Sequence, residues 1–191
     1  MGRRRRSRRE LLSAGSTLFA AGSTLLASGF AGCLEESPGA DDPQLGDPEP
    51  FVEIELTTAP NGERVDPSAV HLVDGGTIEW VGGDGRHDTT AYHPATHGDQ
   101  RRIPDAAEPW ASDVLDDGDS FDRTFDDEGV YDYVCTRHEA VGMVGTIVVG
   151  WPDPDDQPAL ESPSESYPPA AVEELERLND RVRAFLEDAH R

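Results

Sequence analysis

Hydrophobic and polar residues alternate along the middle of the chain. Val52, Ile54 and Leu56 are separated by Glu53 and Glu55, which is the two-residue period of a strand with one buried face. Short strands of this kind, separated by Gly- and Asp-rich turns, predict an all-β sandwich over residues 51–150. The other segments that we expect to form strands are residues 69–73, 77–81, 88–93, 120–125, 130–135 and 146–149.

Two further features of this region are typical of a sandwich with elaborated connections. Residues 127–131 resemble a tyrosine corner, in which the phenol of Tyr131 bonds back to a neighbouring backbone group. The span from Tyr92 to Asp119 is long for a connection between strands and contains three prolines. We therefore expect an ordered excursion there rather than core strands.

The hydrophobic period changes near the C-terminus. Apolar residues from Val172 to Phe185 follow one another at spacings of three and four, which predicts an amphipathic α-helix over residues 169–191. The helix either packs on the sandwich or forms a coiled coil with a partner or a second copy. In the second interpretation Leu175, Leu178 and Val182 would form the contact between chains.

The N-terminus is typical of an exported lipoprotein. Residues 7–12 resemble a twin-arginine signal and are followed by an apolar run that ends in Phe30-Ala31-Gly32-Cys33, which resembles a lipobox. We expect residues 1–33 to be this signal, with a lipid on Cys33 that anchors the protein to the outer face of the cell membrane. An uncleaved N-terminal anchor helix is the alternative.

Two proline- and acid-rich segments flank the predicted domain. Residues 34–50 are expected to form an extended tether, because their composition cannot build a core. Residues 151–168 have a similar composition and are expected to link the domain to the helix.

The charge of the chain limits its partners. The formal net charge is -23, and all 16 basic residues are arginine. A surface this acidic repels itself and stays soluble, as in proteins adapted to high salt. It also repels phosphates, so nucleic-acid binding is not expected.

The candidate chemistry lies in a short segment that contains Cys135, His138 and Met143, with the spacing Cys-x2-His-x4-Met. A trigonal set of two imidazoles and a thiolate, with a weak axial thioether, is the arrangement of a blue-copper electron-transfer centre. The alternatives for Cys135 are a buried, inert thiol and a disulfide with Cys33.

A second imidazole has to come from elsewhere in the chain, and His87, His93 and His97 are the candidates. We choose His87, because it follows a predicted strand and a Gly-rich loop at one end of the sandwich. His71 lies in a strand-like segment and is expected to be an ordinary strand residue. His93 and His97 could instead form a second metal site.

The domain resembles plastocyanin and, more closely, the halocyanin-like copper proteins of halophilic archaea. The resemblance covers about residues 51 to 150 and implies a Greek-key cupredoxin sandwich that binds one type 1 copper. It also implies the ligands His87, Cys135, His138 and Met143. The segments that carry the resemblance are residues 76–80, His87, residues 131–138 and residues 142–149.

Several residues depart from the family pattern. Arg86 and Arg137 stand where the family often has proline; they are expected either to dock an acidic partner and raise the reduction potential, or to pair with nearby acids. Asp88 stands where asparagine is usual and is expected to accept a hydrogen bond from Thr136. Val134 replaces a tyrosine that plant plastocyanins use as an electron route, so we expect electrons to leave near His138.

These features together predict an electron carrier that serves a membrane electron-transport chain through redox partner proteins. Two other classes remain open. A small copper enzyme would need a second metal at His93 and His97, whereas a copper storage or delivery protein would bind cuprous ion without transferring electrons.

Overall fold

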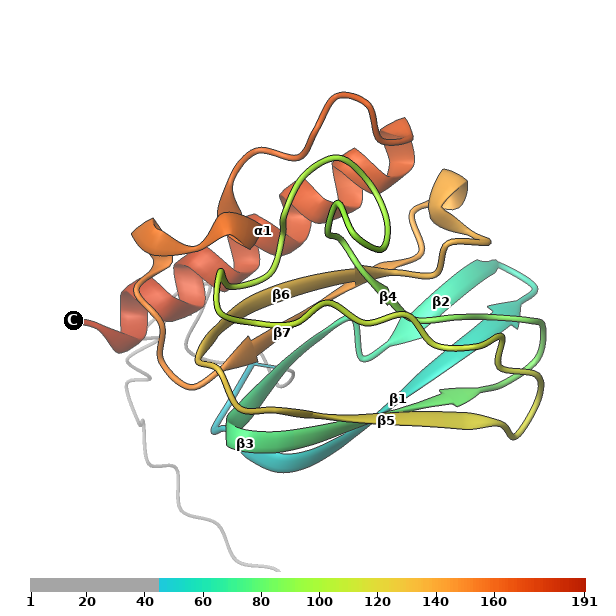
Figure 1. Ribbon diagram of the computed structural model, residues 1–191, viewed down its shortest axis with the longest axis horizontal. Coiled ribbons are helices and arrows are strands. Elements are labelled where there is room, and N and C mark those ends of the chain that lie inside the picture. Colours follow the sequence, from blue (N-terminus) through green and yellow to red (C-terminus); the bar gives the residue numbers. More distant parts are fainter. Residues whose placement is uncertain (1–44) are drawn as a thin grey trace, which may run out of the picture. The chain divides into compact units, whose positions relative to one another are not determined.

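The computed structural model describes residues 45–191; the predicted signal, Cys33 and residues 34–44 of the tether lie outside this range. Within it, short strands precede one long helix, as the hydrophobic pattern predicts (Figure 1). The elements are β1 (Glu49–Ala59), β2 (Gly62–Asp66), β3 (Ala69–Gly82), β4 (Thr90–Ala91), β5 (Ser120–Phe125), β6 (Gly129–Val134), η1 (Glu139–Val141), β7 (Val144–Val149), η2 (Pro154–Asp156), η3 (Pro158–Leu160) and α1 (Pro169–Ala189).

Strand β3 joins the two layers of the sandwich. Its first residues, from Ala69 to Leu72, pair with β7, whereas Gly76 to Val81 pair with β5 and, on the other side, β1 runs parallel to it. Gly75, with φ of 75°, lies where β3 passes from one layer to the other. One layer therefore has the order β2-β1-β3-β5 and the other the order β3-β7-β6-β4.

The observed strands differ from the predicted ones in two places. Residues 77–81 and 69–73 belong to one long strand, and the strand expected at 88–93 is reduced to β4. The backbone around β4 pairs instead with the excursion after Tyr92, through bridges from His87 to Leu115 and from Thr90 to Ala111. The excursion is ordered, as expected, because it contributes three buried side chains to the core between the layers: Ile103, Trp110 and Leu115.

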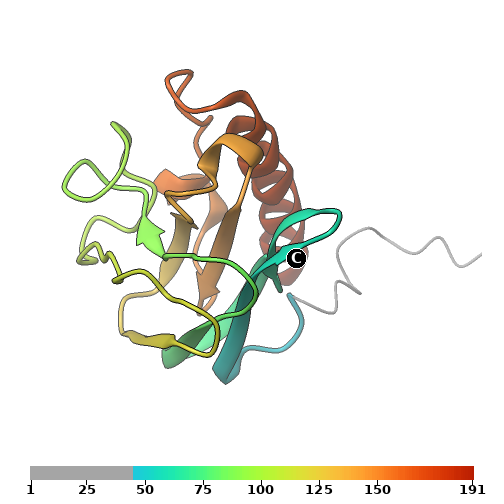
Figure 2. The same ribbon diagram turned by 90° about the vertical axis from the view of Figure 1, so that its right-hand side faces the viewer.

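Helix α1 covers the outer face of the β6–β7 layer (Figures 1 and 2). Every residue of β6 and β7 is buried, since one face of each strand contacts the inner core and the other contacts the helix. The interpretation of the helix as packed on the sandwich is confirmed. A coiled coil through Leu175, Leu178 and Val182 is wrong, because all three side chains are fully buried within one chain.

The segment between the domain and the helix is packed rather than loose. Residues 151–168 form two 3-10 turns and bury Ala159, Leu160 and Tyr167. The side chain of Arg102 holds this segment against the sandwich. Its Nε donates to Asp132 Oδ2 at 2.8 Å, and both side chains are 0% exposed. The same guanidinium also donates to the backbone carbonyl of Ala159.

The folded region also reaches further toward the N-terminus than the predicted domain. Leu45, which we placed in the tether, is 1% exposed, and β1 begins at Glu49. His71 holds this segment, because its two ring nitrogens lie 2.8 Å from the carbonyl oxygens of Gly46 and Gly150. His71 is thus a strand residue, as predicted, and the structure shows in addition that its ring ties two segments together. Among the residues described, none lies in a helix that is long and apolar enough to span a membrane.

Candidate metal centre

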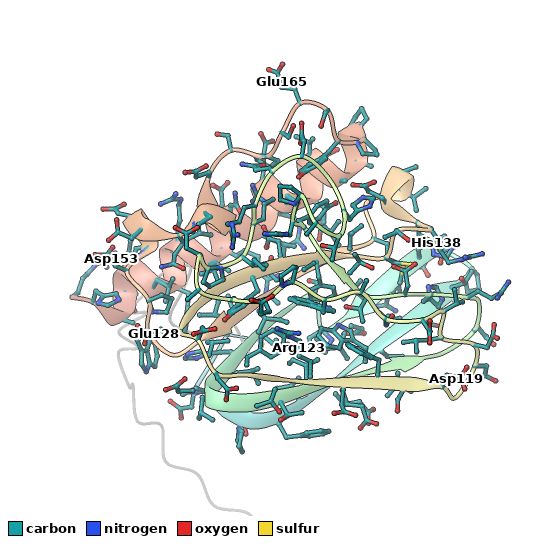
Figure 3. The ribbon with its side chains drawn as sticks, viewed as in Figure 1. Asp119, Arg123, Glu128, His138, Asp153 and Glu165 are labelled. Atoms are coloured by element: carbon teal, nitrogen blue, oxygen red, sulfur yellow. The ribbon has the colours of Figure 1, made fainter. Side chains whose placement is uncertain are left out.

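Three side chains from two distant segments meet at one end of the sandwich. Cys135 Sγ lies 3.4 Å from His138 Nδ1 and 3.9 Å from His87 Nδ1. Their ligand atoms all lie within 4.8 Å of one another, and no other such His, Cys, Asp or Glu group was found within residues 45–191. Figure 3 places His138 at the end of the molecule where the β1–β2 hairpin also ends. This is the set of side chains that the sequence pattern singled out.

Backbone hydrogen bonds close the loop that follows β6. His138 N donates to Cys135 O at 2.9 Å, and Cys135 N donates to Met143 O at 3.0 Å. The second bond brings Met143 beside Cys135 at the start of β7. Met143 is 2% exposed and belongs to the core between the layers. Met143 is therefore buried in the same core cluster as Cys135, and its thioether could supply a weak fourth ligand to a metal held by the thiol and the two imidazoles.

Gly142 allows this loop to turn. Its φ is 81°, in the left-handed region, and it ends the 3-10 turn that begins at Glu139. A Cβ atom at this position would lie 2.9 Å from the carbonyl oxygen of Ala170, in the first turn of α1. The C-terminal helix thus supports the loop that carries His138 and Met143.

A backbone carbonyl orients the ring of His87. His87 Nε2 lies 3.0 Å from Asp84 O, and a carbonyl oxygen can only accept, so Nε2 carries the hydrogen. The lone pair of Nδ1 is then free and faces Cys135 Sγ. An outer hydrogen bond of this kind fixes the tautomer of a metal-binding histidine.

Asp88 connects the two segments that supply the candidate ligands. Its Oδ1 accepts from Thr136 N at 2.9 Å, and its Oδ2 accepts from Thr136 Oγ1 at 2.8 Å. Thr90 Oγ1 also donates to Oδ1, at 3.2 Å. The hydrogen bond expected from Thr136 to Asp88 is present, and the structure contains one from the backbone N–H as well as one from the hydroxyl.

Burial affects the charge state of the thiol. Removal from water raises the pKa of Cys135, and the nearby Asp88 carboxylate adds to the effect, although backbone N–H groups partly oppose it. The metal-free thiol is therefore protonated at neutral pH. A metal that binds the thiolate has to displace this proton.

The two arginines of the proposed docking patch have different surroundings. Arg86 Nε lies 2.9 Å from Asp116 Oδ1, so the alternative in which it pairs with a nearby acid is the one that the structure contains. Arg137 is exposed beside His138. The positive patch is thus reduced to Arg137.

The histidines considered for a second metal have other partners. His93 Nδ1 accepts a hydrogen bond from Ala95 N at 3.0 Å. His97 Nε2 lies 3.0 Å from a carboxylate oxygen of Glu139, whose other oxygen accepts from the Tyr92 hydroxyl at 2.9 Å. These contacts attach the excursion after Tyr92 to the loop that carries His138.

Sequence reasoning missed one charged neighbour of the centre. Glu63 Oε2 lies 3.8 Å from His138 Nδ1, although Glu63 is on β2 and 75 positions earlier in the chain. No local pattern signals this contact. The Asn61-Gly62 turn predicts a hairpin but does not show which part of the protein the hairpin contacts.

The donor set fits a soft or borderline metal ion. It offers one thiol, two imidazole nitrogens and a neighbouring thioether, and the ring of His87 already presents a free lone pair. This combination is typical of a type 1 copper centre.

Comparisons with known proteins agree with this chemistry. The model of the family "Copper binding proteins, plastocyanin/azurin family" matches residues 53–150. A halocyanin of Natronomonas pharaonis is 38% identical over 92 residues, which are 47% of this chain and 50% of that protein. The chain thus spans about half the length of this curated relative.

Solved structures give the same fold. A pseudoazurin from Sinorhizobium has a TM-score of 0.57 at 22% identity, and the match covers 71% of this chain and 98% of that one. The pseudoazurin of Methylobacterium extorquens has a TM-score of 0.55 at 25% identity, covering 69% and 98%. The predicted cupredoxin sandwich and copper cofactor are confirmed, and the chain belongs to the plastocyanin/azurin family of copper-binding proteins.

Proposed function

We propose that this protein is an electron carrier with a single type 1 copper bound by His87 Nδ1, Cys135 Sγ, His138 Nδ1 and Met143 Sδ. The convergence of one thiol and two imidazole nitrogens beside a buried methionine is the observation that carries the proposal. Copper, when bound there, supplies a one-electron couple between its cuprous and cupric states. The family, one of copper-binding proteins, supports the same conclusion.

The role of the chain is to keep one ligand geometry in both oxidation states. Cys135 directly follows β6, which is buried on both faces, so the sulfur has little freedom to move. The backbone carbonyl of Asp84 holds the ring of His87, and the hydrogen bonds from Thr136 to Asp88 hold the two ligand segments at a fixed separation. Small rearrangement favours rapid electron exchange.

Electrons are expected to enter and leave through His138. Its side chain is 25% exposed, whereas His87 and Cys135 are buried. Val141, which is 63% exposed, adds apolar surface from the turn that follows His138. A redox partner would dock over this edge, with Arg137 contributing a positive charge. Replacing Arg137 by Glu should slow electron transfer to an acidic partner, and an unchanged rate would remove Arg137 from the docking surface.

We also propose that the protein acts at the outer face of the cell membrane. The support is the twin-arginine pattern, the lipobox that ends at Cys33 and the acidic segment that follows it. In this setting the partners are redox proteins of a membrane electron-transport chain. Replacing Cys33 by Ser should release the protein from membranes into the medium, and retention of the variant in the membrane fraction would contradict lipid attachment.

The visible spectrum of the copper-loaded protein tests the proposed function. A thiolate bound to cupric ion absorbs intensely toward the red end of the spectrum, and Cys135→Ser should abolish this band while the chain stays folded. A delivery protein for cuprous ion would lack the band. A copper enzyme would bind a second metal equivalent, which the existing partners of His93 and His97 disfavour.

A further inference from the structure

The hairpin formed by β1 and β2 ends over the metal centre. Its register pairs Thr58 with Glu63 and Ala59 with Gly62. Thr58 N donates to Asp84 O at 2.6 Å, and Asp84 O also accepts from His87. The hairpin is thus attached to the loop that orients one of the candidate ligands.

Gly85 permits this close approach. Its φ is 112°, and a Cβ atom there would clash with Thr58 Oγ1 and lie 2.7 Å from His87 Nε2. The absence of a side chain leaves the Thr58 hydroxyl in place beside the metal end of the sandwich.

The hydroxyl of Thr58 in turn positions a carboxylate. Thr58 Oγ1 donates to Glu63 Oε2 at 2.7 Å, and the same oxygen lies 3.8 Å from His138 Nδ1. The side chains of His138 and Glu63 are 25% and 18% exposed, so solvent screens their interaction incompletely. Nδ1 is the ring nitrogen that lies 3.4 Å from Cys135 Sγ. Glu63 therefore approaches His138 from the side on which the metal binds.

The arginines that follow Glu63 and precede His87 in the chain form ion pairs with carboxylates other than Glu63. Arg64 pairs with Asp66 at 3.5 Å, and Arg86 pairs with Asp116. Glu63 also lies outside the compact group of His87, Cys135 and His138, so its charge acts from beside the ligands.

We propose that Glu63 tunes the copper centre by lowering its reduction potential. A cupric centre carries one more positive charge than a cuprous centre, so a fixed carboxylate beside His138 stabilises the cupric state more. This inference rests on the proposed function, because it requires copper at the ligands named above. Each tenfold change in the preference for cupric over cuprous ion is 59 mV in a one-electron couple.

Redox titration of the full, copper-loaded protein tests this role. Glu63→Gln removes the charge and keeps the shape of the side chain, and we expect its midpoint potential to rise by at least 59 mV, a tenfold loss of cupric preference. The matched control is Glu53→Gln, an identical change on β1 at an exposed position farther from the hairpin tip. We expect the control to shift the potential much less. Thr58→Val should shift it in the same direction as Glu63→Gln, by a smaller amount.

The dependence on salt distinguishes a local effect of the Glu63 charge on the reduction potential from a general effect of the net charge. The Glu63→Gln shift should persist in molar salt, where exposed charges are screened over about 3 Å. Equal shifts in Glu63→Gln and Glu53→Gln, or a Glu63→Gln shift that vanishes in high salt, would overturn the proposal. Loss of the visible band in Glu63→Gln alone would also overturn it, since the carboxylate would then be needed to build the site. If the unaltered protein lacks the band, the proposed function itself fails.

Discussion

Asp88 accepts two hydrogen bonds from Thr136, one from the backbone N–H and one from the hydroxyl, at 2.9 and 2.8 Å. The contact joins the residue after His87 to the residue after Cys135. The two ligand segments are 48 positions apart in the chain, and this carboxylate fixes their separation. The geometry of the centre therefore depends on a side chain that does not itself need to touch the metal.

Replacing Asp88 by Asn should raise the reduction potential. The change removes a negative charge near the thiolate but keeps one oxygen that can accept a hydrogen bond from Thr136. Asp88→Ala removes both acceptors and should destabilise the protein by about 1–3 kcal/mol, because the N–H of Thr136 loses its partner. Redox titration and chemical unfolding measure the two effects. Asp117→Asn, at an exposed position, serves as the charge control; an equal rise in that variant would show that the effect is not local.

Replacing Arg102 by Ala should destabilise the protein by about 3–5 kcal/mol, since it leaves the Asp132 carboxylate buried without its partner. The neighbouring Arg101 provides the control: its pair with Asp105 is exposed and is worth about 0–1 kcal/mol. Chemical unfolding at constant high salt compares the two variants. A similar loss in both would mean that the buried pair does not hold residues 151–168 and α1 to the sandwich.

Gly142→Ala should disturb the loop that carries His138 and Met143 through a steric clash, in addition to the strain of a left-handed backbone. The φ of Gly142 is 81°, and the added Cβ would meet the carbonyl oxygen of Ala170. Gly118→Ala is a matched control, because its φ is 82° and nothing lies within 4 Å of the added atom. Both variants should lose about 1–3 kcal/mol from the strained backbone, but only Gly142→Ala should also alter the visible spectrum and release copper faster. Identical spectra in the two variants would exclude support of the loop by α1.

The metal-free protein should lose stability as the pH rises above the ordinary pKa of cysteine, about 8.5. Burial raises the pKa of Cys135 in the folded state, so the unfolded chain releases this proton first. Between the two pKa values the free energy of unfolding falls by up to about 1.4 kcal/mol per pH unit. The contribution is complete below pH ~8.5 and is lost as the pH rises through the folded-state pKa.

Unfolding of the metal-free protein and of Cys135→Ser, between about pH 8.5 and 10, measures this difference. The free energy of unfolding should fall less steeply with pH in Cys135→Ser, because serine does not titrate in this range. With copper bound, the unaltered protein should no longer lose stability as the pH rises, since the bound sulfur is a thiolate and its proton has already left. Parallel pH profiles for the two metal-free chains would mean that burial does not perturb the thiol.

The local pattern of the sequence determined much of this protein. The alternation in β1, the strand that ends at Cys135 and the helical stripe of α1 each depend on neighbours a few positions apart, so their periods reveal them. The segment with Cys135, His138 and Met143 is equally local, because one loop carries three of the four proposed ligands. The choice of His87 needed more, namely the expectation that loops gather at one end of a sandwich.

Only the tertiary structure decided which distant residues meet. Nothing near Glu63 in the chain shows that it lies beside His138, and nothing near Arg102 shows that it pairs with Asp132. Their positions follow from the way β3 passes between the layers and from the excursion after Tyr92, which are results of packing the whole core. Contacts between distant segments depend on that packing, so the position of Glu63 beside His138 could be found only in the folded chain, whereas Asp88 and Arg137 could be placed from their neighbours in the sequence.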